Sequence, residues 1–157
     1  MLEEEIIGLL VESDKTLAVA ESCTGGLIGH RLTQVSGSSA AFLGGVIAYH
    51  NSVKEKPLGV PADVLESEGA VSEATAVAMA EGVRRLLGAD IALAVTGIAG
   101  PTGGTEERPV GLTYIALSAA PAVLTCERHL WQGKREENKD SSATAALSLL
   151  YRHLKER

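Results

Sequence analysis

Aromatic residues are scarce in this chain, because phenylalanine, tyrosine and tryptophan make up only 3% of its 157 residues. Hydrophobic residues still reach 45%, so the core has to be built mainly from Ala, Val, Leu and Ile. Such small side chains, with 17 glycines, suit close packing of helices on a sheet better than an all-β sandwich. A chain of this length buries roughly two-thirds of its surface on folding, which is enough for one domain.

Positive charge is limited too, since 14 Lys and Arg against 20 Asp and Glu give a net charge of −6 without any basic run. Neutralising phosphates requires clustered lysines and arginines, so we expect no nucleic-acid partner. No run of 18 apolar residues could span a bilayer. The acidic start of the chain is not a secretory signal. We therefore expect a cytoplasmic protein that does not bind membranes.

Cysteine is equally rare, with only Cys23 and Cys126, which is typical of cytosolic proteins rather than disulfide-stapled ones. The metal-binding patterns CxxC and HExxH are absent and the four histidines are scattered, so we predict no metal site. Neither a P-loop nor a dinucleotide fingerprint occurs. No cofactor is implied by these patterns.

Apolar periodicity predicts helices and strands in alternation. The expected helices are 2–13, 27–35, 63–68, 72–87 and 140–155, and the expected strands are 17–20, 42–49, 91–95, 112–117 and 123–130. The near-continuous apolar run at 42–49 is typical of a strand buried on both faces, and the last two strands form an antiparallel pair. The fold class predicted is α/β, a three-layer α/β/α single domain over residues 1–157 with a mixed, mostly parallel sheet.

The stretch from Ala20 to Gly26 joins the first strand to a helix. Unpaired N–H groups at such a helix start favour an anion or a developing oxyanion. Ser22 and Thr24 add hydroxyl groups, and Gly25 and Gly26 let a ligand approach the backbone closely. An ordinary helix N-cap would explain the same residues.

Two further segments, 49–54 and 96–105, also follow strands, and the ends of neighbouring strands converge in one crevice in open α/β sheets. The second of these segments contains four glycines and three threonines. Its residues Gly100, Gly103, Gly104 and Thr105 could cradle a phosphate through successive N–H groups. A flexible surface loop is the alternative interpretation.

Lys54 is either a surface lysine, as we expect for Lys56, or a general base. In an apolar crevice its pKa falls, and a neutral lysine can take the proton from a serine. We expect the side chains of Ser22 and Lys54 to share one pocket. Tyr49 either orients Lys54, donates to the oxyanion or simply packs at a strand end. Arg135 either contacts a phosphate or belongs to a solvated turn.

Several motifs together resemble those of the CinA C-terminal domain family. They are AESCTGG at 20–26, YHNSVK at 49–54, GAVS at 69–72, TGIAGPTGGT at 96–105, RPVG at 108–111 and GKR at 133–135. The resemblance covers essentially the whole chain in the family's order. Several members of this family are nicotinamide mononucleotide deamidases, which release ammonia from the carboxamide and leave nicotinic acid mononucleotide.

The resemblance implies a serine/lysine amidohydrolase with Ser22 as nucleophile, Lys54 as base and Tyr49 alongside. The N–H groups from Thr24 to Gly26 would hold the oxyanion. The glycine loop and Arg135 would hold the 5′-phosphate. The family usually carries a second arginine further along, where this chain has Lys139, which provides a point charge in place of a fork of donors.

The function predicted is therefore hydrolysis of nicotinamide mononucleotide, a small-molecule nucleotide substrate, by a protein that forms a homo-oligomer. A competing hypothesis is a non-catalytic module that binds a nucleotide or a partner in DNA uptake or repair. A third is hydrolysis of another amide or ester by the same two residues. Only the enzyme requires a desolvated Lys54 within reach of the Ser22 hydroxyl.

Overall fold

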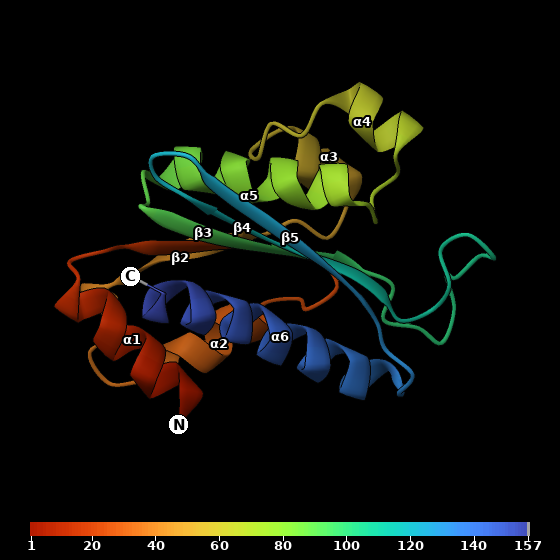
Figure 1. Ribbon diagram of the computed structural model, residues 1–157. Coiled ribbons are helices and arrows are strands. Elements are labelled where there is room, and N and C mark those ends of the chain that lie inside the picture. Colours follow the sequence, from red (N-terminus) through yellow and green to blue (C-terminus); the bar gives the residue numbers. More distant parts are fainter. Residues whose placement is uncertain (157) are drawn as a thin grey trace.

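The computed structural model describes residues 1–156. The elements are α1 (Leu2–Glu12), β1 (Leu17–Glu21), α2 (Leu27–Thr33), the 3₁₀ turn η1 (Ser38–Ala40), β2 (Phe42–Ile47), α3 (Asn51–Glu55), α4 (Ala62–Ser67), α5 (Glu73–Leu87), β3 (Ile91–Gly97), β4 (Leu112–Ala119), β5 (Val123–Leu130) and α6 (Arg135–Lys155). Helices α1, α2 and α6 cover one face of the sheet, and α3, α4 and α5 lie on the other (Figure 1). The predicted three-layer α/β/α fold is thus confirmed.

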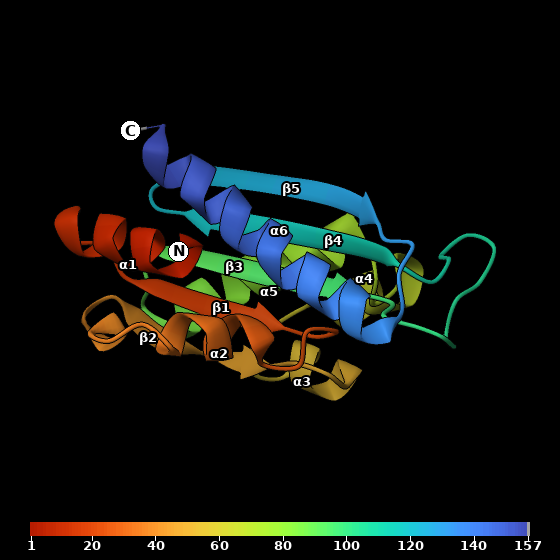
Figure 2. The same cartoon turned by 90° about the horizontal axis from the view of Figure 1, so that it is seen from below.

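The sheet has the order β2-β1-β3-β4-β5, which can be followed in Figure 2. β1 pairs in parallel with β2 and with β3, while β4 runs antiparallel to β3 and β5. From β1 the chain passes through α2 to β2 on one side, and then through α5 to β3 on the other. Ligands of open α/β sheets bind outside the carboxyl ends of strands at such a reversal, so this topology points to the ends of β1 and β3.

Large and small residues are segregated between the two faces of the sheet. Along β1, Leu17 and Val19 belong to the core under α1, α2 and α6, whereas Ala18 and Ala20 belong to the core under α5. β3 and β4 repeat this alternation of large and small side chains. Helix α5 therefore packs closely against a layer of alanine methyl groups in the sheet, and few aromatic residues are needed to fill that layer.

Helix α5 begins and ends where the sequence predicts. The Ser72 hydroxyl accepts a hydrogen bond from the Thr75 N–H at 3.1 Å, and Gly88 ends the helix in the left-handed conformation at φ 66°. Inside the helix, a Cβ added to Gly82 would lie 1.9 Å from the carbonyl oxygen of Leu58. Because Leu58 follows α3, this glycine lets the segment that carries α3 lie directly against α5.

We predict that Gly82→Ala lowers the free energy of unfolding by about 1–3 kcal/mol, the usual cost of overpacking a tight contact. Urea denaturation measures the change. Gly8→Ala in α1 is the matched control, because an added Cβ there meets nothing within 4 Å and alanine is the better helix former by up to about 1 kcal/mol. Equal stability of the Gly82→Ala variant and the wild type would contradict the close contact.

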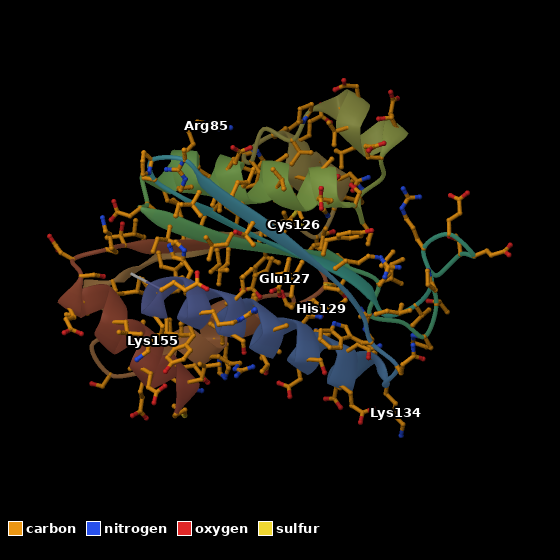
Figure 3. All side chains as sticks on the ribbon, in the orientation of Figure 1. Arg85, Cys126, Glu127, His129, Lys134 and Lys155 are labelled. Carbon is orange, nitrogen blue, oxygen red and sulfur yellow. The ribbon has the colours of Figure 1, made fainter. Side chains whose placement is uncertain are left out.

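Strand β5 is tied to α6 by a group of polar and aromatic side chains. The rings of His129 and Trp131 stack with centroids 4.7 Å apart, and the Trp131 indole donates to Ser142 Oγ at 2.9 Å. Glu127, which Figure 3 labels with His129 on this strand, accepts from Arg152 Nη2 at 2.9 Å. These contacts fix the direction of α6 across the sheet.

Two sequence predictions about the elements are wrong, and one short helix was not predicted. The strand at 42–49 is not buried on both faces: β2 lies at the sheet edge, and its residues alternate between half-buried and exposed. Residues 51–55 form helix α3, which is too short to show periodicity. Helix α6 starts at residue 135 rather than 140, because the Glu137 carboxylate accepts from the Lys134 N–H at 2.8 Å in its first turn.

Candidate active site

A cleft of about 330 Å³ lies at the carboxyl ends of β1 and β3. The turn after β1 contributes Ser22 and Cys23, and the end of β3 with the loop after it contributes residues 96–100, 102 and 103. Tyr49, helix α3, residues 70–71 and Arg135 complete the lining. The cleft thus occupies the position that the strand order indicates, and all three segments predicted to converge do contribute to it.

Within this cleft Lys54 and Ser22 are in contact. Lys54 Nζ lies 3.1 Å from Ser22 Oγ, and it also donates to the carbonyl oxygens of Ala48 at 2.7 Å and Tyr49 at 3.2 Å. Ser22 directly follows β1 and extends its pairing with β3, since its N–H donates to the Val95 carbonyl at 3.0 Å. The expectation that both side chains share one pocket is confirmed.

Lys54 is the largest fully buried side chain, with 1% of its surface exposed. No carboxylate lies within ion-pair distance of it in residues 1–156. Burial away from water lowers the pKa of Lys54 below its ordinary value, and the neighbouring Cys23 thiol opposes this shift only in part. A buried lysine without a counter-ion is the condition under which an amine becomes available as a base.

His50 fixes the start of the helix that carries Lys54. The imidazole of His50 accepts a hydrogen bond from the Ser52 N–H at 3.1 Å, and it caps α3. The Val60 N–H then donates to the Lys54 carbonyl at 3.0 Å and closes the chain back on the helix. This local geometry aims the lysine inward, and no periodic pattern in the sequence indicates it.

Tyr49 and Arg135 meet at the outer side of the cleft. Arg135 Nη2 donates to the Tyr49 hydroxyl at 3.2 Å, and Nη1 donates to the Gly100 carbonyl at 2.7 Å. The Tyr49 side chain is 63% exposed, so it covers the cleft from outside and does not fill the core. The guanidinium has five N–H donors, so three remain for a ligand.

Thr24, Gly25 and Gly26 line a different hollow. This second hollow, of about 650 Å³, lies between the start of α2 and the first turns of α6, where it is lined by Lys139 and three acidic residues. The Gly25 N–H donates to the Ser22 carbonyl at 3.1 Å, and the Gly26 N–H donates to Glu21 Oε1 at 3.2 Å. Their predicted role in holding an oxyanion stays a prediction, and both N–H groups already have protein acceptors.

The glycine loop contributes only in part. Gly100 and Gly103 line the cleft, whereas Gly104 and Thr105 do not. The Thr105 hydroxyl accepts from the Arg108 N–H at 3.0 Å, which closes a turn of the loop. The Arg108 guanidinium donates to the Val71 carbonyl at 3.1 Å and also to the Glu68 carbonyl, so it fastens the loop to the segment before α5.

Several residues that shape the cleft carry no recognisable signal in the sequence. Asn51 and Thr102 are part of its lining. Asn138, only 2% exposed, donates to the carbonyls of Ala99 and Gly133 at 3.0 Å each. It thereby ties the glycine loop to the start of α6 beside Arg135. A lone asparagine just before the predicted helix 140–155 gives no sequence signal for such a role.

The cleft also contains a thiol. Burial raises the pKa of Cys23 to about 12, so Cys23 is almost wholly protonated at neutral pH and a poor nucleophile. Within residues 1–156 there is no group of three or more His, Cys, Asp or Glu side chains placed to hold a metal ion. The same residues include no helix that is both long and apolar enough to cross a membrane.

Comparison with known proteins gives consistent matches over almost the whole chain. The family model described as CinA C-terminal domain matches residues 1–154. A putative competence-damage inducible protein from Desulforudis audaxviator is 51% identical over 148 residues, which cover 94% of this chain and 36% of the relative. A CinA-like protein from Syntrophus aciditrophicus is 52% identical over 153 residues, covering 98% of this chain and 36% of the relative.

Crystal structures match as well. The competence/damage inducible protein CihA from Agrobacterium tumefaciens superimposes with a TM-score of 0.95 at 39% identity, covering 98% of this chain and 93% of the other. A CinA superfamily protein from Klebsiella pneumoniae gives 0.95 at 31% identity, with 99% and 97% covered. The chain spans little more than a third of the length of the curated relatives it matches. On sequence and structure together, the chain belongs to the CinA C-terminal domain family.

Proposed function

We propose that this chain hydrolyses the carboxamide of nicotinamide mononucleotide to nicotinic acid mononucleotide and ammonia. The observation that carries the proposal is the buried Lys54 amine 3.1 Å from the Ser22 hydroxyl, in a cleft at the ends of two strands. The choice of nicotinamide mononucleotide as the substrate rests on the motifs that this chain shares with deamidases of the family. Both cysteines are free, which supports a reaction in the reducing cytoplasm.

The surroundings of Lys54 suit a neutral amine. Such an amine has two N–H donors and one lone pair, and two backbone carbonyls, those of Ala48 and Tyr49, are in place to accept from the donors. The remaining neighbour is the Ser22 hydroxyl, whose Oγ lies 3.1 Å from Nζ; in the neutral amine the lone pair faces this hydroxyl and can take its proton. The two carbonyls thus orient the base as an aspartate orients the histidine of a triad.

The reaction proceeds in two balanced steps. Ser22 Oγ forms a bond to the carboxamide carbon, and its proton moves to Lys54 Nζ. When the tetrahedral intermediate collapses, the C–N bond breaks and the leaving nitrogen takes that proton and departs as ammonia. Water, deprotonated by Lys54, then attacks the ester; the Oγ–C bond breaks, and Ser22 recovers its proton as the carboxylate product leaves.

Donors for the oxyanion come from the turn after the nucleophile. The N–H of the residue next to the nucleophile serves this purpose in other strand-to-helix nucleophile turns. Here that residue is Cys23, followed by Thr24. We assign the oxyanion to the Cys23 N–H, since Cys23 lines the cleft. Thr24, Gly25 and Gly26 line the other hollow, and the N–H groups of Gly25 and Gly26 donate within the protein.

An ammonia-release assay tests the proposal directly. We expect turnover of nicotinamide mononucleotide and none of nicotinic acid mononucleotide, which has no amide to lose. Release of ammonia from unrelated amides at equal rates would instead favour a broader amidase. A folded protein that binds the nucleotide without releasing ammonia would favour the non-catalytic module.

Arg135 provides a second test, because its free donors face the cleft beside Gly100. We predict that Arg135→Ala weakens binding of the mononucleotide by roughly 1.5–3 kcal/mol, the range of a charge-assisted contact. Nicotinamide riboside, which lacks the phosphate, should be a poor substrate for the wild type and should lose little further with the variant. KM values for both substrates measure this.

Lys134→Ala is the control for that experiment, since Figure 3 shows Lys134 pointing away from the body of the molecule. It should leave both KM values within about twofold, as surface substitutions usually do. If the wild type hydrolysed riboside and mononucleotide at equal rates, the assignment of phosphate binding to Arg135 would be wrong.

A further inference from the structure

Glu21 is a buried carboxylate immediately before the candidate nucleophile. It is the last residue of β1, and only 2% of its surface is exposed. Within residues 1–156 it has no ion-pair partner. Burying a charge without a counter-ion is costly unless hydrogen bonds compensate, so the structure must gain something from keeping an acid here.

Four donors surround this carboxylate. Oε1 accepts from the Thr24 hydroxyl at 2.6 Å, from the Gly26 N–H at 3.2 Å and from the Ile28 N–H at 2.9 Å. Oε2 accepts from the Gly29 N–H at 3.0 Å. Gly26, the N-cap of α2, has no side chain to satisfy these groups, so Glu21 does so from the preceding strand.

The alternation of the strand gives Glu21 and Ser22 opposite directions. Glu21 points to the face of the sheet that α2 covers, where its donors lie. Ser22 points to the opposite face, where Lys54 reaches it from α3. The turn that carries Ser22 is therefore held on one side by the carboxylate of its neighbour and on the other by its contact with the base.

We propose that Glu21 is the positioning residue of the nucleophile: it locks the turn from Ser22 to Gly26 so that the Ser22 hydroxyl stays aligned with Lys54. The inference rests on the proposed function insofar as Ser22 is the nucleophile. It goes beyond that function in assigning a role to a residue that touches neither substrate nor base. Rigid support of this kind matters because a displacement of about 1 Å at a reacting atom can cost 100-fold in rate.

The test is the rate at which Ser22 reacts with a fluorophosphonate, a serine-directed probe, in Glu21→Gln and wild-type protein. Glutamine keeps the size of the side chain, but its amide group presents N–H where the Gly29 N–H needs an acceptor. We expect the labelling rate per folded molecule and the kcat for nicotinamide mononucleotide to fall by about 10- to 100-fold. We also expect KM to stay within about threefold and the pH midpoint of kcat, which reports Lys54, to stay unchanged.

Glu3→Gln is the matched control. Glu3 is also buried, at 8% exposure, and it accepts from Arg31 Nε at 3.3 Å, in a contact that does not involve the Ser22 turn. Its loss should change stability and leave the labelling rate at the wild-type value. A folded Glu21→Gln variant that labels as fast as the wild type would overturn the proposal.

Thr24→Val decides the question if Glu21→Gln does not fold, because it removes one donor to Glu21 Oε1 and keeps the shape of the side chain. A drop of about three- to tenfold in labelling supports positioning, in line with the loss of one charge-assisted hydrogen bond, and an unchanged rate contradicts it. Wild-type labelling of Ser22 without release of ammonia would refute the proposed substrate while leaving this inference intact. A wild-type Ser22 that does not react with the probe would refute both.

Discussion

Replacing Lys54 by methionine is expected to abolish turnover while the protein still folds and binds its substrate. Methionine keeps the apolar stem but has no amine, so nothing accepts the Ser22 proton at 3.1 Å. General-base catalysis contributes about 10²- to 10⁴-fold to a rate, and we expect kcat to fall by at least that factor. Affinity for nicotinamide mononucleotide should remain within a few-fold, as measured by calorimetry.

Lys56→Met is the control for this prediction. Lys56 lies two residues further along and is exposed to solvent, so its loss should leave kcat unchanged. Full activity of Lys54→Met would end the serine/lysine mechanism. Loss of activity in both variants would point to a general effect of charge in place of a base.

The Lys54→Met variant should also differ from the wild type in how its free energy of unfolding depends on pH. Because burial lowers the pKa of Lys54 in the folded protein, the unfolded chain binds the proton more tightly. The folded state therefore gains stability as pH rises from the lowered pKa to the unfolded value of about 10.4. We expect the free energy of unfolding of the wild type to rise, relative to Lys54→Met, across that window. A flat difference in urea titrations at several pH values would contradict the lowered pKa.

Ser22→Ala should be as severe, since the loss of a nucleophile removes the covalent intermediate itself. We expect kcat to fall by about 10³-fold or more, and labelling by a fluorophosphonate to disappear, with little change in thermal stability. Cys23 cannot substitute for Ser22, because burial raises the pKa of its thiol to about 12. Burial likewise raises the pKa of Cys126, to about 11.

An alkylating agent separates the two nucleophiles in the wild type. Iodoacetamide at pH 8 should leave most activity in place, because few molecules carry either thiolate at that pH. Rapid inactivation with modification at Cys23, together with wild-type activity of Ser22→Ala, would transfer the nucleophile from the serine to the cysteine.

The sequence sufficed for the elements that have strong local signals. Helix α5 carries a Ser72 cap, a regular apolar face and a terminal Gly88, and all three are found. The short apolar strands have equally clear signals. Because the ends of neighbouring strands converge, Ser22 and Lys54 were predicted to lie close together, and they do. The CinA family itself could be identified from motifs alone. The homo-oligomer remains a prediction.

What the sequence could not give depends on contacts between distant segments. The position of β2 at the sheet edge follows from the strand order, and its apolar run resembles that of a central strand. Thr24 and Gly26 line the hollow beside α6, and both donate to the Glu21 carboxylate on that face of the sheet. Nothing local distinguishes a glycine turn that awaits an anion from one in which the protein already supplies it.

The layer of alanine side chains under α5 affects how well the candidate site tolerates mutations. The segment that carries Lys54 packs against α5 at Gly82, and α5 packs against Ala18, Ala20 and their neighbours in the sheet. The distance between Lys54 Nζ and Ser22 Oγ therefore depends on how closely α5 packs on the sheet, and only alanine methyl groups lie between the helix and the sheet there. A single added methylene at Ala20 would move α5, the segment that carries α3 and the Lys54 amine together. Mutations in this layer, outside the cleft lining, can therefore change the catalytic rate without altering any residue that performs the reaction.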